Sequence, residues 1–232
     1  SMHRPLIYAH RGSSFDHPEN TRAAFMAAIT DGADGFECDL RLTKDNQVII
    51  WHDSNMLRMA NHKAVVAHTE YSELKEIYPD LMLLTELLEI ASKYKKALAL
   101  ETKHPVPSGN EVENKILELV KPYKGLDIAL LSFSWLALEK VARLETGIET
   151  VALVNVLNAP VMNRFSSAKS FAPSIEEIRD HPELVAKYQS EGKRVFVWTV
   201  NEVIDLKLCT QLGVDVVITD MPARALSELG YP

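Results

Sequence analysis

The sequence predicts an α/β fold of the (β/α)8 TIM-like barrel type, with a β-hairpin excursion after the second strand. Short β-rich runs alternate with amphipathic helical patterns along the whole chain, and there are eight such runs. Alternation of this kind implies right-handed crossovers and a parallel sheet. Eight repeats in 232 residues suit a closed barrel better than an open dinucleotide-binding sheet, since no strand is followed by a G-x-G-x-x-G turn.

The expected elements follow from two different periodicities. The strands are apolar runs at residues 6–10, 35–42, 97–103, 128–133, 149–156, 169–173, 194–200 and 214–219. The helices place apolar residues three and four positions apart at residues 21–29, 72–77, 83–94, 112–120, 136–144, 182–189, 203–212 and 223–229. The first helix has a good start, because Pro18 and the Glu19–Asn20–Thr21 run supply capping groups.

One segment interrupts the alternation, because LRLTKDNQVIIWHD consists of two apolar arms around a polar turn. A hairpin is the simplest interpretation. With Asp45 and Asn46 as the two turn residues, Asp39 faces His52 on one side of the ribbon. A slip of one residue would move His52 to the opposite face.

Composition predicts one globular domain over residues 1–232, and Ser1 before Met2 has the look of a cloning remnant. The net charge of −7 argues against a nucleic-acid partner. No apolar run approaches the ~18 residues of a transmembrane segment, and we expect a cytoplasmic protein. Cys38 and Cys209 are expected to be isolated buried thiols, which suits a reducing compartment.

Charged groups gather where the apolar runs of the first half end. They are His10, Arg11, Glu37, Asp39, His52, Glu101 and Lys103. Strand alternation directs Glu37 and Asp39 to one side and Cys38 to the other. We therefore expect three carboxylates, two imidazoles and two cations to converge if these strands are neighbours.

The three carboxylates indicate a metal site. Two carboxylates about 4 Å apart repel by roughly 4 kcal/mol at an effective dielectric constant of 20, unless a cation lies between them. Oxygen donors from Glu37, Asp39 and Glu101 suit one divalent cation, Mg²⁺ or Ca²⁺. Taken alone, the Glu37–Asp39 pair would be interpreted as solvated; Glu101 and the flanking histidines favour the metal.

His10 and His52 suit an acid/base pair, because imidazole titrates near neutrality. A single strand histidine is more often structural, but two at the ends of apolar runs favour function. Arg11 and Lys103 supply fixed positive charge for an anion, and beside a metal they indicate a phosphoryl centre. Their alternative role is in structural ion pairs with neighbouring carboxylates.

Several long motifs make the chain similar to a known family. AHRGSSFDHPENTRAAF, GADGFECDLRLTKDNQVIIWHD, LETK, VFVWTVN and GVDVVITDMP occur in this order between residues 9 and 222. They resemble the glycerophosphodiester phosphodiesterase family. The resemblance implies a TIM-like barrel and metal-assisted hydrolysis of a small glycerophosphodiester to glycerol 3-phosphate and an alcohol.

By the same resemblance, the family's site residues fall on the positions already singled out. His10 and His52 match its two histidines, Arg11 its arginine, and Lys103 a phosphate contact; the metal ligands match Glu37, Asp39 and Glu101. Trp198 matches a residue of the substrate pocket, although a core aromatic is an equal interpretation. Asp220 with Pro222 also resembles family positions, and turn chemistry is the alternative interpretation of both.

The chain departs from the family pattern between Ser54 and Asp80, which we interpret as a lid or substrate loop. The sequence leaves several questions open. They are the identity of the leaving alcohol, the choice between direct attack by water and a cyclic phosphate intermediate, which histidine is the acid and which the base, and the oligomeric state. Two other functions are carried forward. One is a lysophospholipase D or phospholipase C-like enzyme, which would need an apolar segment to contact lipid, and the LMLLTELL run is apolar enough for that role. The other is a noncatalytic phosphate-binding module.

Overall fold

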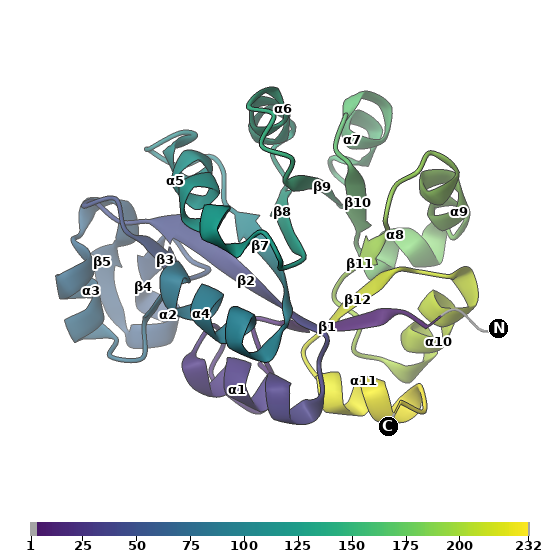
Figure 1. Ribbon diagram of the computed structural model, residues 1–232, viewed down its shortest axis with the longest axis horizontal. Coiled ribbons are helices and arrows are strands. Elements are labelled where there is room, and N and C mark those ends of the chain that lie inside the picture. The colour runs from purple at the N-terminus through teal and green to yellow at the C-terminus, as the bar shows by residue number, and fades with distance from the viewer. Residues whose placement is uncertain (1–3, 232) are drawn as a thin grey trace.

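A computed structural model describes residues 4–231 as a closed barrel of parallel strands surrounded by helices (Figure 1). The barrel strands are β1 (Leu6–His10), β2 (Gly35–Leu42), β7 (Ala97–Thr102), β8 (Ile128–Ser132), β9 (Glu149–Val154), β10 (Ser170–Pro173), β11 (Phe196–Val197) and β12 (Val216–Thr219). The hydrogen-bonded order is β10-β9-β8-β7-β2-β1-β12-β11. Isolated parallel bridges of Phe171 with Val195 and of Ser174 with Trp198 close the ring between β10 and β11.

The barrel has two apolar layers, because its strands are buried on both faces. Inside, Tyr8 and Phe196 meet edge to face, with ring centroids 6.1 Å apart, among small and branched side chains such as Ala99 and Val216. Outside, residues of opposite parity, such as Phe36 and Leu100, pack against the helices. This two-sided burial explains why the strands appear in the sequence as nearly continuous apolar runs.

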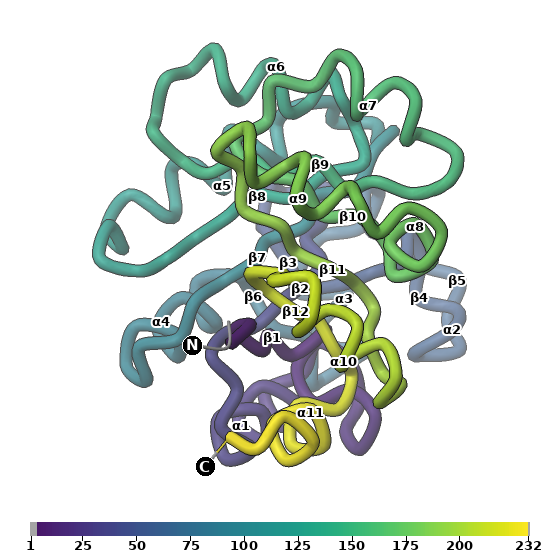
Figure 2. The backbone as a smooth tube through the Cα atoms, turned by 90° about the vertical axis from the view of Figure 1, so that its right-hand side faces the viewer, coloured from purple at the N-terminus to yellow at the C-terminus, as the bar shows by residue number. Residues whose placement is uncertain are grey.

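The helices form the outer layer of the barrel. They are α1 (Arg22–Asp31), α4 (Leu84–Tyr94), α5 (Glu111–Val120), α6 (Trp135–Arg143), α7 (Ala159–Phe165), α8 (Ile175–Asp180), α9 (Glu183–Ser190), α10 (Val203–Leu212) and α11 (Pro222–Glu228), with a 3-10 turn at Lys121–Tyr123. From opposite ends of the chain, α1 and α11 lie side by side in Figures 1 and 2. Thr21 caps α1, as the predicted helix start implied, and its hydroxyl accepts a hydrogen bond from the Ala24 N–H.

The excursion after β2 is a small folded unit beside the barrel, at the left of Figure 1. It comprises β3 (Val48–Ile50), β4 (Asn55–Met56), α2 (Leu57–Ala60), β5 (His62–Val65), a 3-10 turn (Val66–His68), α3 (Tyr71–Ile77) and β6 (Met82–Leu83). Strands β3 and β6 extend the main sheet from β2, while β4 and β5 pair separately. The unit has a core of its own around Trp51 and Leu74.

The predicted hairpin is present, but its register was wrong by one residue. Leu42 pairs with Val48 and Leu40 with Ile50, so Asp39 lies opposite Trp51 instead of His52. The turn has three residues, because Thr43 N–H donates to the Gln47 carbonyl and Asn46 adopts a left-handed conformation with φ 60°. Three-residue loops of this form are common, and the Thr43 hydroxyl favours this one by donating to Asp45 at 2.6 Å.

The eight predicted strands are all present, and the structure confirms the TIM-like barrel. Helices α2, α7 and α8 were not predicted, since their short sequences show too little helical periodicity to detect. The LMLLTELL run belongs to the core, because Leu84, Leu87 and Leu88 are fully buried. Among the described residues, no helix has the length and apolar character needed to cross a membrane.

Candidate active site

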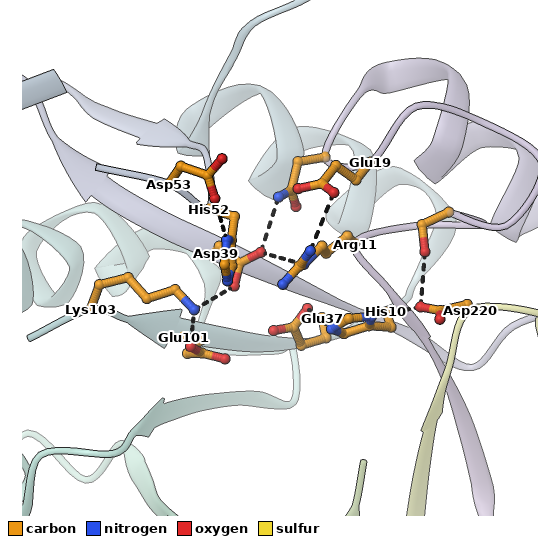
Figure 3. Close-up of polar contacts among 12 residues, drawn as sticks. His10, Arg11, Glu19, Glu37, Asp39, His52, Asp53, Glu101, Lys103 and Asp220 are labelled. Carbon is orange, nitrogen blue, oxygen red and sulfur yellow. Dashed lines mark hydrogen bonds and ion pairs between the residues drawn. The ribbon is translucent and has the colours of Figure 1, made fainter. Parts of the chain in front are cut away.

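Strand register brings the predicted carboxylates and one imidazole together at the carboxyl-terminal end of the barrel (Figure 3). His10 on β1 pairs with Glu37 on β2, and Asp39 on β2 pairs with Glu101 on β7. Neighbours in register on parallel strands point to the same side. Consequently one carboxylate oxygen from each of Glu37, Asp39 and Glu101 lies within 4.8 Å of the others.

These three carboxylates are buried and strongly coupled. Burial and the neighbouring charge of Asp39 raise the pKa of Glu37 to about 8, and the same two causes raise the pKa of Glu101. Burial also opposes ionisation of Asp39, but Lys103 and Arg11 lower its pKa well below the ordinary value. Oε1 of Glu37 is buried and accepts no hydrogen bond from residues 4–231. Among these residues, the nearest cationic group to this oxygen is the imidazole of His10, whose Nε2 lies 3.9 Å away, beyond hydrogen-bond distance.

Two cations lie on the other side of the cluster. Nε of Arg11 is 2.9 Å from Oδ2 of Asp39, and Nζ of Lys103 is 2.9 Å from Oδ1 of Asp39 and also contacts Glu101. Arg11 lies in the turn after β1 with φ 59°. The next residue must be glycine, because a Cβ on Gly12 would lie 2.6 Å from the Ala24 backbone of α1.

Each predicted catalytic histidine has a carboxylate on Nδ1. Asp220, at the end of β12, lies 2.6 Å from Nδ1 of His10, and Asp53 lies 2.6 Å from Nδ1 of His52. Although burial opposes protonation of His10, Glu37 and Asp220 raise its pKa above the ordinary value. Burial lowers the pKa of His52 despite the opposing influence of Asp39 and Asp53.

A second set of residues supports these groups, and the sequence did not reveal their roles. Asn20, with φ 58°, donates to Oδ2 of Asp39 at 3.1 Å, and Glu19 lies 3.2 Å from Arg11. Arg58 of α2 bridges Glu19 and Asp53 with contacts of 2.8–2.9 Å. In the sequence, Glu19 and Asn20 were interpreted as part of a helix start and Asp53 directly follows His52, whereas Arg58 carried no signal.

The site opens into a cavity of about 200 Å³ with a polar half and an apolar half. The polar half includes six predicted residues: His10, Arg11, Glu37, His52, Glu101 and Lys103. The apolar half includes Phe133 and Trp198, whose rings meet edge to face at 5.7 Å. Trp198 Nε1 donates to the Ala172 carbonyl at 2.7 Å. Asp39 does not line the cavity, although its carboxylate belongs to the same cluster as Glu37 and Glu101.

His52 reaches this cavity although the hairpin register was wrong. Strand β3 ends at Ile50, and the last ladder contact is the Trp51 N–H donating to the Asp39 carbonyl at 2.9 Å. Beyond that point strand alternation no longer fixes the direction of a side chain. The guanidinium of Arg41 holds the turn, because its Nε donates to the His52 carbonyl at 2.8 Å.

A closed parallel barrel that gathers these groups at the carboxyl ends of its strands defines a TIM-barrel enzyme. The chain belongs to the glycerophosphoryl diester phosphodiesterase family, whose model matches residues 10–224. It is 32% identical to a glycerophosphodiester phosphodiesterase of Bacillus altitudinis, over 95% of this chain and 96% of that protein.

Solved structures agree with this membership. The glycerophosphodiester phosphodiesterase of Thermotoga maritima superposes with a TM-score of 0.85 at 26% identity, covering 98% of this chain and 99% of that one. A phosphodiesterase of Oleispira antarctica, solved in complex with the product sn-glycerol-3-phosphate, gives a TM-score of 0.83 at 25% identity and covers 97% of both chains.

Proposed function

We propose that this protein hydrolyses a glycerophosphodiester to glycerol 3-phosphate and an alcohol, with one divalent cation, Mg²⁺ or Ca²⁺. The observation that carries the proposal is the pair of carboxylate-held imidazoles that border the same cavity as a buried carboxylate cluster. Family membership supports the reaction type. The glycerol 3-phosphate bound to the Oleispira antarctica relative supports the identity of the product.

The carboxylates fit a hard cation. Three oxygens lie within 4.8 Å of one another, and Oε1 of Glu37 has no hydrogen-bond donor within the described residues. All donors are carboxylate oxygens, which Mg²⁺ and Ca²⁺ prefer. Glu37, Asp39 and Glu101 would hold the ion, which when bound polarises a phosphoryl oxygen and offsets negative charge.

Arg11 and Lys103 are proposed to bind the phosphoryl group. Both line the cavity, and each contacts one carboxylate oxygen of Asp39. Their positive charge would stabilise the negative charge that develops on the phosphoryl oxygens in the transition state. Trp198 and Phe133 would pack against the carbon skeleton of the substrate on the opposite wall.

His10 and His52 are proposed as the acid/base pair. A carboxylate on Nδ1 fixes the tautomer and the ring orientation, so that Nε2 is the atom left to exchange a proton with the reacting groups. One imidazole would take the proton of the nucleophile, which is water or a neighbouring glycerol hydroxyl. The other would deliver a proton to the leaving alcohol oxygen.

Turnover of glycerophosphocholine tests the proposal, with glycerol 3-phosphate detected as product. We expect hydrolysis with Mg²⁺ or Ca²⁺ and its loss after exhaustive chelation. His10→Ala and His52→Ala should each remove most turnover while the protein stays folded by circular dichroism. Activity that survives chelation would contradict the metal site, and a fully active double variant would contradict the acid/base pair.

The same assay separates the alternative functions. A lysophospholipase D would prefer a long-chain lysophospholipid over glycerophosphocholine, and a binding module would bind either compound without turnover. The cytoplasmic location expected from the sequence stays a prediction.

A further inference from the structure

Arg41 is a half-buried cation that the proposed mechanism does not use. It lies two residues after Asp39, on the same side of β2. Its Nε donates to the His52 carbonyl, but no acidic side chain within residues 4–231 lies close enough for an ion pair, which requires 4.0 Å or less. The guanidinium therefore makes no ion pair within the described residues, and burial lowers its pKa although Asp39, Asp53 and Glu101 partly offset the effect.

The nearby carboxylates already have other partners. Asp53 is held by Arg58 and His52, while Asp39 is held by Arg11 and Lys103. Partly burying a guanidinium without an anion costs free energy. A site that leaves such a group without an ion pair and only partly compensated by more distant carboxylates is suited to an anion supplied from outside.

Arg41 lines a second cavity, separate from the catalytic cavity but sharing Lys103 with it. The second cavity has a volume of about 140 Å³ and lies between the excursion and the loop after β7. Its polar lining consists of Arg41, Ser54, His68, Lys103 and Ser108, and none of its described lining residues is acidic. The remaining wall is aliphatic, including Val66 and Pro105. The cavity therefore suits a small group that carries negative charge.

We propose that this second cavity binds a carboxylate on the leaving alcohol of the substrate, and that Arg41 is the residue that recognises it. The inference rests on the proposed function, because the phosphodiester must first occupy the catalytic cavity. Lys103 lines both cavities, so an alcohol that leaves the phosphorus on the Lys103 side would extend towards Arg41. The planar guanidinium matches a carboxylate in two-point contact, which a single ammonium does not provide.

Two substrates isolate this contact. Glycerophosphoserine and glycerophosphoethanolamine differ by one carboxylate, so the ratio of their kcat/KM values measures its recognition. We expect the wild-type protein to favour glycerophosphoserine by about tenfold or more, as for a charge-assisted hydrogen bond. Arg41→Gln should bring the ratio close to one, and Arg41→Lys should give an intermediate ratio.

The ratio is the readout because Arg41 also holds the His52 carbonyl. A general disturbance of His52 lowers both rates together and leaves the ratio unchanged. Arg22→Gln is the matched control, since Arg22 is an exposed arginine on α1 paired with Glu86; it should keep the wild-type ratio.

A substrate-side measurement needs no variant. The methyl ester of glycerophosphoserine keeps the ammonium group and removes the negative charge, so wild-type kcat/KM should fall to the glycerophosphoethanolamine value. Hydrolysis of both parent substrates at equal efficiency, or an ester as good as the acid, would overturn the inference while leaving the phosphodiesterase activity intact. If neither substrate is hydrolysed while glycerophosphocholine is, the inference falls and the proposed function stands; if none of the three is hydrolysed, the proposed function falls, and this inference with it.

Discussion

The buried, ionisable side chain of Glu37 should make the metal-free protein less stable at neutral pH than a variant that lacks the ionisable group. Glu37 is 2% exposed, and its pKa of about 8 lies far above the ordinary 4.5. We predict that Glu37→Gln abolishes turnover but raises the free energy of unfolding when divalent cations are removed.

The sign and size follow from proton linkage. Between pH 4.5 and pH 8 the unfolded chain has released a proton that folded Glu37 retains, so the free energy of unfolding falls as pH rises through this window. At pH 7 the resulting loss is about 3 kcal/mol. Glu37→Gln has no such proton. The difference between its free energy of unfolding and that of the wild type should therefore grow by about 3 kcal/mol from pH 4.5 to pH 7.

Urea unfolding followed by tryptophan fluorescence, in the presence of a chelator, measures this difference at a series of pH values. Glu118→Gln on α5 is the control, because the Glu118 side chain is 66% exposed and should show no such trend. Adding Mg²⁺ or Ca²⁺ at about 100 times its Kd should stabilise the wild type by about 3 kcal/mol and the Glu37→Gln variant far less. A constant stability difference between pH 5 and pH 7 in chelator would refute the reasoning.

Three further substitutions test the groups around the site. Asp220→Asn removes the carboxylate on Nδ1 of His10 and should lower kcat by about 100-fold; wild-type kcat would show that Asp220 does not orient the imidazole. Arg58→Ala breaks the bridge to Glu19, so kcat should fall, but thermal unfolding should reveal a loss of only about 1 kcal/mol because Arg58 is nearly half exposed. Trp198→Ala removes apolar wall and should raise KM by about tenfold with a smaller change in kcat; steady-state kinetics with unchanged KM would place Trp198 outside the substrate contacts.

Local periodicity was sufficient to predict most of the fold and the centre of the site. Strand alternation placed Glu37 and Asp39 on one side of β2, and the alternation of strands and helices implied the parallel neighbours that bring Glu101 and His10 beside them. These relations follow from the alternation of side chains along a strand and from the order of strands and helices, and both can be deduced from the sequence. The metal and acid/base roles of these residues stay predictions.

The sequence could not fix features that depend on competing turns or distant contacts. A two-residue and a three-residue turn fit the Asp45–Asn46 region almost equally, and the Thr43–Asp45 hydrogen bond decided between them. Arg58 gave no signal, since its partners Glu19 and Asp53 are brought together only by the folded excursion. Such contacts depend on the relative placement of whole elements.

The contact between His10 and Asp220 joins residues 210 positions apart in the chain. During synthesis, the histidine of β1 emerges early, whereas its carboxylate partner emerges only with the end of β12. A chain that has made every proposed metal ligand therefore still lacks the group that orients His10. Full activity would then report that the last strand has docked against the first, so that turnover measures completion of the barrel as well as the chemistry within it.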